Sequence, residues 1–214
     1  MKLFLVLAAI FASTFLVAKF FGLISVPKIE GWLDQAQQLS PLYVGVIVAL
    51  LLFADLFIAV PTLTITILAG YFLGFPMGAL AALLGTMTAG CTGYFLSHRF
   101  GETILGVISK DKAKLQEAKQ VFQQHGFVMI LLSRAAPIIP EVSACLAGAT
   151  RMPFPRFLTA WSFCTLPYVT IAAWAGSVSS IENPKPAIFT AIAITGTLWL
   201  AWFAFHRMNK AIKN

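Results

Sequence analysis

Three ionisable side chains, Asp55, Arg134 and Glu141, stand inside stretches of the sequence that are otherwise apolar. A charge placed in hydrocarbon is costly, so such residues usually serve a function or pair with one another. Arg134 carries a planar fork of N–H donors that matches a phosphate group. Asp55 and Glu141 are carboxyl groups that can take up protons where burial disfavours their charge. The alternative is structural: Arg134 pairs with one of the carboxylates and only holds the surrounding segments together.

These residues belong to two interrupted apolar segments, residues 52–74 and 130–150. Each segment combines an ionisable residue with helix-breaking proline and with glycine. The residues that we assign to the formation of hairpins are Pro61, Gly70, Pro137, Pro140 and Gly148. The landmarks of the two segments recur at an offset of 78 or 79 positions, which indicates an internal repeat. Paired interruptions of this kind are typical of transporter sites, and irregular backbone at membrane depth must be buried in protein. We therefore expect two re-entrant hairpins.

The composition indicates a membrane protein, because 59% of the 214 residues are hydrophobic and only 11% are charged. Soluble domains carry roughly 25% charged residues. We expect a single membrane domain over residues 1–214. Its expected parts are an N-terminal transmembrane helix (1–27), an interfacial helix (28–41), a first re-entrant repeat with its transmembrane helix (42–97), a cytoplasmic loop with an amphipathic helix (98–125), a second re-entrant repeat with its transmembrane helix (126–177) and a C-terminal transmembrane helix (187–206).

The basic residues suggest how this domain is oriented. With the hairpins returning to opposite sides, eleven lysines and arginines lie on the cytoplasmic side and three lie outside. This distribution satisfies the positive-inside rule and puts both termini in the cytoplasm of a bacterial inner membrane. A single crossing between the repeats makes them face opposite sides. The predicted fold class is thus an all-α membrane protein, an inverted repeat with two opposed re-entrant helical hairpins and flanking transmembrane helices.

Other classes of function lack support in the sequence. The net charge of +7 is explained by cytoplasmic loops rather than by nucleic-acid binding, since no basic patch is interleaved with aromatic residues. The cysteines and histidines are isolated, so we expect no metal site and no cofactor. No catalytic motif is present, and we expect no enzymatic activity. Arg151 and Arg156 either anchor the topology or contact anionic headgroups.

Two blocks of the sequence resemble a known family. The first is SRAAPIIPE at 133–141 with AGATRM at 147–152 and Phe157, and the second runs from AGYFLG at 69–74 to RFG at 99–101. Together they resemble the DedA/VTT superfamily, also called the SNARE-associated Golgi protein family, over about residues 50–180. The resemblance implies two opposed re-entrant hairpins and a role in moving lipids across the bilayer. It also implies that Asp55 is the membrane acid before the first hairpin and that Arg134, Pro137 and Pro140 belong to the second.

One departure concerns the substrate that the resemblance implies. Members of the bacterial DedA branch usually carry a second arginine shortly after the hairpin proline, whereas this chain has Glu141, Val142 and Ser143. The chain looks more like another branch of the superfamily, so a polyprenyl-phosphate substrate does not transfer directly.

The leading hypothesis is a flippase-like or scramblase-like transporter of phospholipid or polyprenyl phosphate. Its expected partners are the phosphate headgroups of membrane lipids and, if transport is coupled, protons; a homo-oligomer is compatible with the sequence. Two alternatives stay open: an ion-coupled carrier of a small soluble solute, and a scaffold for membrane biogenesis that transports nothing.

Overall fold

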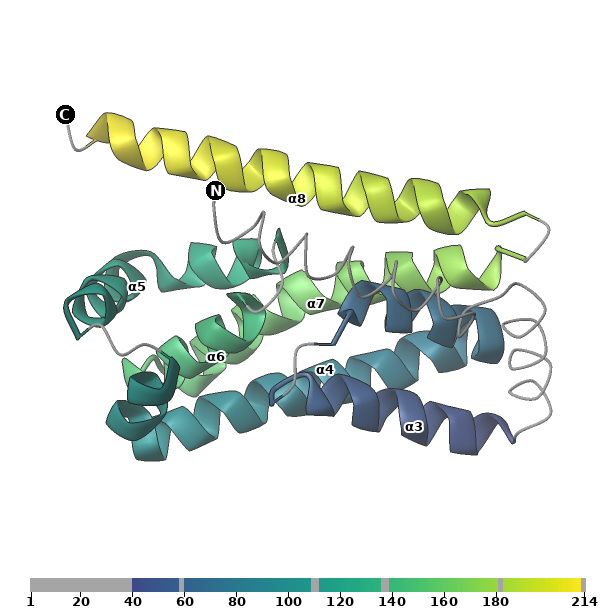
Figure 1. Ribbon diagram of the computed structural model, residues 1–214, viewed down its shortest axis with the longest axis horizontal. Coiled ribbons are helices and arrows are strands. Elements are labelled where there is room, and N and C mark those ends of the chain that lie inside the picture. The colour runs from purple at the N-terminus through teal and green to yellow at the C-terminus, as the bar shows by residue number, and fades with distance from the viewer. Residues whose placement is uncertain (1–39, 58–59, 109–111, 136–138, 181–182, 213–214) are drawn as a thin grey trace, which may run out of the picture. The chain divides into compact units, whose positions relative to one another are not determined.

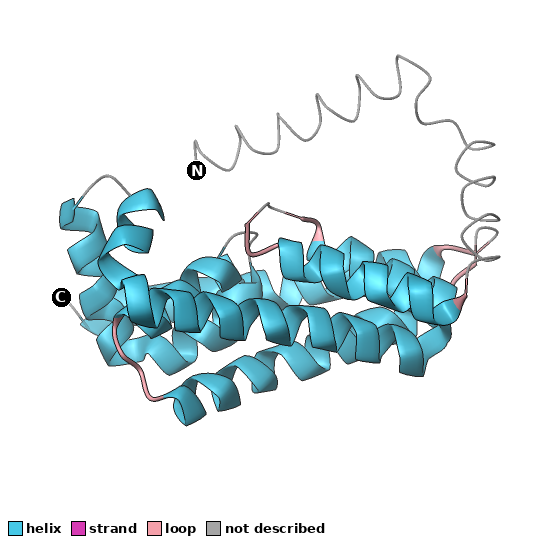
Figure 2. Ribbon diagram, turned by 90° about the horizontal axis from the view of Figure 1, so that it is seen from below, coloured by secondary structure: helices cyan, strands magenta, loops and turns pink. Residues whose placement is uncertain are grey.

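A computed structural model describes residues 40–57, 60–108, 112–135, 139–180 and 183–212. All regular elements in these ranges are helices (Figure 2), which confirms the all-α class for the described part of the chain. The elements are α3 (Pro41–Ala54), α4 (Thr62–Ile108), α5 (Lys112–Leu132), the 3-10 helix η1 (Ser133–Ala135), α6 (Ile139–Ala149), α7 (Phe154–Ser177) and α8 (Lys185–Ile212). The expected N-terminal transmembrane helix and nearly all of the interfacial helix lie outside the described residues.

Two of these helices are interrupted by residues with non-helical backbone angles. Helix α4 breaks at Gly74, whose φ of 73° and ψ of 170° suit glycine alone, and again at Phe100. Pro76 follows in the first turn after Gly74, where its missing N–H costs little. Helix α5 breaks at His125. The polar stretch between residues 98 and 125 is therefore mostly helical rather than an open loop.

The chain reverses direction at both interrupted apolar segments. In Figure 1, α3 runs from right to left and the first part of α4, residues 62–73, returns to the right. After Gly74 the rest of α4 crosses to the left end. Helix α6 leads back to the left, and α7 crosses to the right. Helix α8 covers the expected C-terminal span and extends past it to Ile212.

The long part of α4 and helix α7 form the centre of the bundle, where they run antiparallel. Tyr94 stacks on Phe157 at 4.8 Å between ring centroids, and Trp161, one turn further along α7, donates its indole N–H to the carbonyl of Thr86. The Tyr94 hydroxyl also donates to the carbonyl of Met152 in the loop before α7. This aromatic cluster fixes the register of the two helices.

Gly70 and Gly148 hold neighbouring helices at backbone contact. A Cβ at Gly70 in α4 would collide with the carbonyl of Ala173 in α7, and one at Gly148 in α6 would collide with the carbonyl of Tyr94 in α4. Small residues permit such close packing between membrane helices. Both glycines lie within the helices of the two interrupted segments, where they permit this close packing rather than a turn. The chain turns later, at Gly74 and after α6.

The prolines assigned to the hairpins occupy different positions. Pro61 directly precedes α4, where it cannot interrupt a helix. Pro140 is the second residue of α6, a position where its missing N–H has no partner to lose. Pro137 lies outside the described residues.

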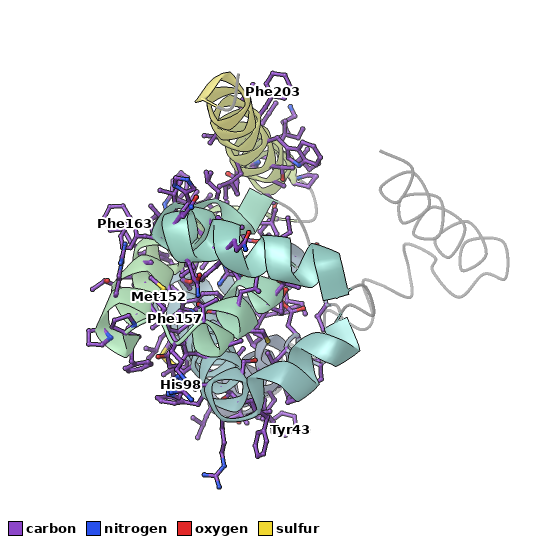
Figure 3. The ribbon with its side chains drawn as sticks, turned by 90° about the vertical axis from the view of Figure 1, so that its left-hand side faces the viewer. Tyr43, His98, Met152, Phe157, Phe163 and Phe203 are labelled. Atoms are coloured by element: carbon purple, nitrogen blue, oxygen red, sulfur yellow. The ribbon has the colours of Figure 1, made fainter. Side chains whose placement is uncertain are left out.

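The apolar exterior agrees with a membrane environment. Two helical segments of the described chain, Thr62–Gly101 and Phe154–Ser177, are long and apolar enough to cross a bilayer. Phe163 and Phe203 are 72% and 62% exposed and lie on the periphery, whereas Phe157 is fully buried (Figure 3). Large exposed apolar surfaces are rare on soluble monomers and are the norm where a helix faces lipid.

Candidate functional site

Asp55 lies immediately after α3 and closes the loop that leads to α4. Its carboxylate accepts hydrogen bonds from the backbone N–H of Val60 at 2.8 Å and from the hydroxyl of Thr62 at 2.9 Å. These bonds tie the end of α3 to the residues that lead into α4. Asp55 therefore has a structural role in shaping the break between the two helices.

Glu141, in the first turn of α6, brings a second carboxyl group to Asp55. The two side chains come from separate helix breaks and lie close enough for their charges to act on each other. Two carboxylates that face each other repel when both are charged. Glu141 also benefits from the α6 N-terminus, which favours negative charge.

Arg134, in η1, lies beside this pair without binding to it directly. Its guanidinium donates to the hydroxyl of Thr165 at 3.1 Å and lies 5.3 Å from the ring of Trp161 and 5.1 Å from the ring of Tyr168. Its charge still acts on Glu141 at longer range. Among the described residues, Arg134 forms no direct ion pair with either carboxylate, and the contacts above join it to α7 instead.

The guanidinium of Arg134 has hydrogen-bonding capacity to spare. Its Nε–H is buried and has no partner among the described residues. Buried donors are almost always satisfied, and an exception points to a site at which a group is missing or arrives transiently. An anionic oxygen would satisfy this donor.

Sequence reasoning brought forward Asp55, Arg134 and Glu141 but missed the helix that holds the arginine. Trp161, Thr165 and Tyr168 recur at intervals of three and four residues, which places them on one face of α7. A polar and aromatic stripe within an apolar span is the signal that could have identified them. Thr165 is fully buried, and the charges of Asp55, Arg134 and Glu141 all act on Tyr168.

The two other arginines predicted from the sequence lie elsewhere, and the threonines in the first turns of α4 differ from one another in their surroundings. Arg151 and Arg156 line a separate pocket that shares no residue with the Asp55, Glu141 and Arg134 group. Thr62 contacts Asp55, and Thr66 is buried and donates to a backbone carbonyl of its own helix. Thr64 is exposed. No group of three metal-ligating side chains occurs within the described residues.

Comparison with known proteins identifies relatives of this chain. A model of the VTT domain family matches residues 60–178. The chain is 25% identical over 174 residues to the uncharacterized membrane protein slr0232 of Synechocystis sp., with 72% of this chain and 78% of that protein covered. It is 26% identical over 164 residues to the inner membrane protein YohD of Escherichia coli, with 69% and 84% covered. No solved structure matches the chain.

Proposed function

Because the chain belongs to the VTT domain family, whose relatives here are named as membrane proteins, we propose that it moves phosphate-bearing lipids across the bacterial cytoplasmic membrane. The observation that carries this proposal is the group formed by Asp55, Glu141 and Arg134. Two carboxyl groups and an arginine with an unsatisfied donor meet inside an apolar bundle. The substrate class is a phospholipid or a polyprenyl phosphate, and the transport is of the flippase or scramblase type.

An inverted-repeat architecture is part of the proposal, and the glycine contacts support it. Gly70 contacts Ala173, and Gly148 contacts Tyr94. The offset of 78 or 79 positions relates Gly70 to Gly148 and Tyr94 to Ala173, so each contact is the image of the other. In a two-fold arrangement, residue i of one repeat contacts residue j of the other, and the equivalent of j in the first repeat contacts the equivalent of i in the second. The two glycine contacts follow this pattern. We infer two opposed re-entrant hairpins, α3 with residues 62–73 and the end of α5 with α6.

In the proposed mechanism, Arg134 binds the phosphate of the headgroup. Its planar guanidinium can offer two parallel N–H donors to phosphate oxygens, and Trp161 and Tyr168 keep it oriented while the site is empty. The lipid tails stay in the bilayer beside the exposed apolar helices. Only the headgroup needs to pass between the two breaks.

Asp55 and Glu141 are the proposed carriers of protons. With one shared proton the pair has a single negative charge, which balances Arg134 at longer range. When a phosphate binds Arg134, this balance is lost, and uptake of a second proton neutralises the carboxyl pair. Binding of lipid and uptake of a proton are thereby linked.

The orientation follows from the positive-inside rule. Arg151 and Arg156 flank the start of α7, and Arg99 lies near the end of the long part of α4, at the same end of the bundle. Basic residues at a membrane face favour the cytoplasm. We therefore assign this end to the cytoplasmic side, together with both chain termini.

The proposal is tested by reconstituting the purified chain into vesicles with fluorescent phospholipids and measuring how fast the outer leaflet exchanges with the inner one. Arg134→Gln should lower the protein-dependent rate at least about tenfold, since one charge-assisted contact is worth about 1.5–3 kcal/mol. Arg99→Gln is the matched control. It removes the same charge from an exposed side chain whose recorded contact is the ring of Phe100, and it should leave the rate unchanged.

Two results would contradict the proposal. Equal exchange rates for wild type and Arg134→Gln would remove the assigned role of the arginine. Wild-type vesicles that exchange no lipid, but accumulate a small soluble anion when a pH gradient is applied, would favour the soluble-solute carrier instead.

A further inference from the structure

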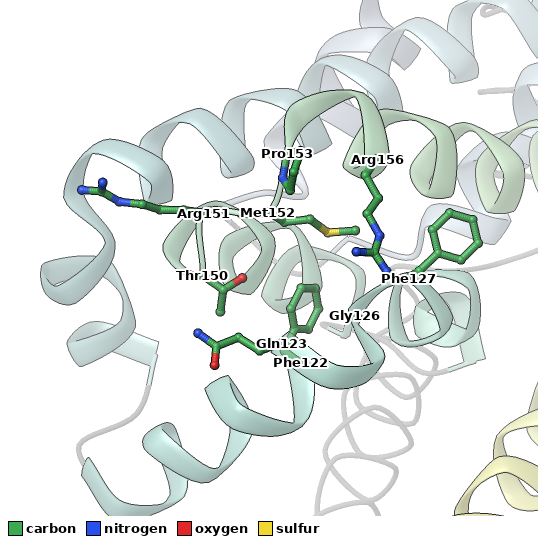
Figure 4. Close-up of a pocket in the computed structure, with 9 residues that line it drawn as sticks. All are labelled: Phe122, Gln123, Gly126, Phe127, Thr150, Arg151, Met152, Pro153 and Arg156. Carbon is green, nitrogen blue, oxygen red and sulfur yellow. The ribbon is translucent and has the colours of Figure 1, made fainter.

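A pocket of about 180 Å³ lies at the end of the bundle where α5, α6 and α7 meet (Figure 4). It is bounded by the middle of α5, by the loop that follows α6 and by the first turn of α7. The lining residues are Phe122, Gln123, Gly126, Phe127, Thr150, Arg151, Met152, Pro153 and Arg156. None of them is acidic, and two are arginines. The pocket therefore favours an anion.

The side chains divide the pocket into a polar and an apolar part. Arg156 turns toward Phe127, so that its guanidinium lies over the pocket, whereas the side chain of Arg151 extends away from the other residues. Gln123 adds an amide whose N–H groups can donate to an anion. Next to these groups, the buried Phe122 and Met152 give the pocket an apolar wall. A small inorganic ion would leave this wall uncovered.

The position of the pocket indicates where its ligand comes from. Phe154 begins one of the two candidate membrane spans, so Pro153 and Arg156 lie at the level where the span enters the headgroup layer. Basic pockets at this level, between helices on the cytoplasmic side, are suited to lipid headgroups.

Arg151 also occupies a backbone conformation that favours glycine. Its φ is 55°, and the N–H groups of Arg151 and Met152 bond back to Gly148 and Ala147 at the end of α6. Glycine is the usual residue at this position of the motif. Arg151 keeps this conformation despite the strain, and its side chain points away from the pocket.

We propose that this pocket is a second lipid site, which binds the phosphate of an anionic headgroup through Arg156 and Gln123 while Phe122 and Met152 contact the adjoining apolar part of the lipid. The site is distinct from Arg134 and does not depend on transport. It would hold a lipid at the cytoplasmic face whether or not that lipid is moved.

The test is a binding titration on the purified full chain in a neutral detergent, in the Arg134→Gln background so that the central site does not contribute. Three ligands are compared: short-chain phosphatidic acid, phosphatidylcholine of the same chain length, and inorganic phosphate. Phosphatidic acid should bind, and the other two should bind at least about tenfold more weakly. Adding Arg156→Gln should weaken phosphatidic acid at least about tenfold, because a charge-assisted contact is lost.

Matched variants make the outcome decisive. Arg99→Gln removes a positive charge at the same end of the bundle from a residue that does not line the pocket. It should change the affinity less than about twofold, since solvent screens charges that make no contact with the ligand. Gln123→Glu places a carboxylate in the pocket and should weaken phosphatidic acid as strongly as Arg156→Gln; Gln123 is exposed, so folding should survive.

The proposal is overturned if Arg156→Gln and Gln123→Glu both bind phosphatidic acid like the background protein. It is also overturned if Arg99→Gln weakens binding equally, which would reveal a diffuse surface charge. Inorganic phosphate that binds as tightly as phosphatidic acid, and competes with it, would assign the pocket to a free phosphate rather than to a lipid. None of these results depends on whether Arg134 supports lipid exchange.

Discussion

Replacing Asp55 by asparagine and by alanine should separate its role in shaping the loop from its role as an acid. Asparagine keeps an oxygen that can accept from the N–H of Val60, and its amide can donate to the hydroxyl of Thr62, which then acts as acceptor. Alanine removes both bonds. Neither variant can hold a proton between itself and Glu141.

The expected loss of stability follows from these two bonds. A hydrogen bond to a charged group contributes about 1.5 kcal/mol or more, so Asp55→Ala should lose roughly 3 kcal/mol of unfolding free energy. Asp55→Asn replaces the bonds by neutral ones and should lose about 1 kcal/mol. For a chain of this size, 1 kcal/mol corresponds to about 2–4 °C, so alanine should lower the melting temperature by about 6–12 °C and asparagine by about 2–4 °C.

Two assays are needed on the same preparations: thermal unfolding in detergent and lipid exchange in vesicles. Asp55→Asn should fold nearly as well as wild type yet lose proton-linked exchange, at least about tenfold at a fixed pH gradient. Thr62→Val is the complementary control, because it removes the hydrogen bond from the Thr62 hydroxyl to Asp55 and keeps the Asp55 carboxyl group. It should lose about 1.5 kcal/mol and retain exchange.

The reasoning is refuted by either of two outcomes. If Asp55→Asn is as unstable as Asp55→Ala, the negative charge itself is required for folding and the hydrogen-bond argument is wrong. If Asp55→Asn is stable and exchanges lipid with the same dependence on the pH gradient as wild type, then Asp55 does not carry the proton.

Three further predictions concern stability and the arginine. Gly148→Ala should lower the unfolding free energy by about 1–3 kcal/mol, because the new Cβ meets the backbone of α4. Gly196→Ala has open space around it and should raise the unfolding free energy by up to about 1 kcal/mol. The melting temperatures of the two variants should therefore move in opposite directions. Arg151→Gly should raise the unfolding free energy by up to about 1 kcal/mol by relieving the positive φ; a lower melting temperature would contradict the strain argument. Arg134→Lys keeps the charge but loses the planar stacking between two rings, so lipid exchange should fall well below wild type, and full activity would show that charge alone is sufficient.

Within the described residues, the sequence was sufficient to predict helices in the apolar stretches and an interruption in each of the two segments, because apolar runs and prolines act locally. It also identified Asp55, Arg134 and Glu141 as candidate site residues, because they are ionisable side chains in apolar segments. Their contact could not be predicted in detail. Asp55 and Glu141 are far apart in the chain and meet only because two separate breaks face each other in the folded bundle.

The roles of individual glycines could not be predicted from the sequence alone. A glycine that turns the chain and one that admits a neighbouring helix look the same in a sequence, since both are selected for the absence of a side chain. Gly70 packs against α7, whereas the left-handed backbone conformation is at Gly74, four residues later. The left-handed conformation of Arg151 gave no signal at all, because arginine is an unfavourable residue for it.

The contacts at Gly70 and Gly148 limit how the protein can move. Backbone touching backbone leaves no compressible side chain between the helices, so residues 62–73 cannot slide along α7, and α6 cannot slide along α4. Rotation about these two points is the motion that remains. For the transport proposed above, we therefore expect the bundle to open by tilting about these two contacts rather than by sliding of its helices.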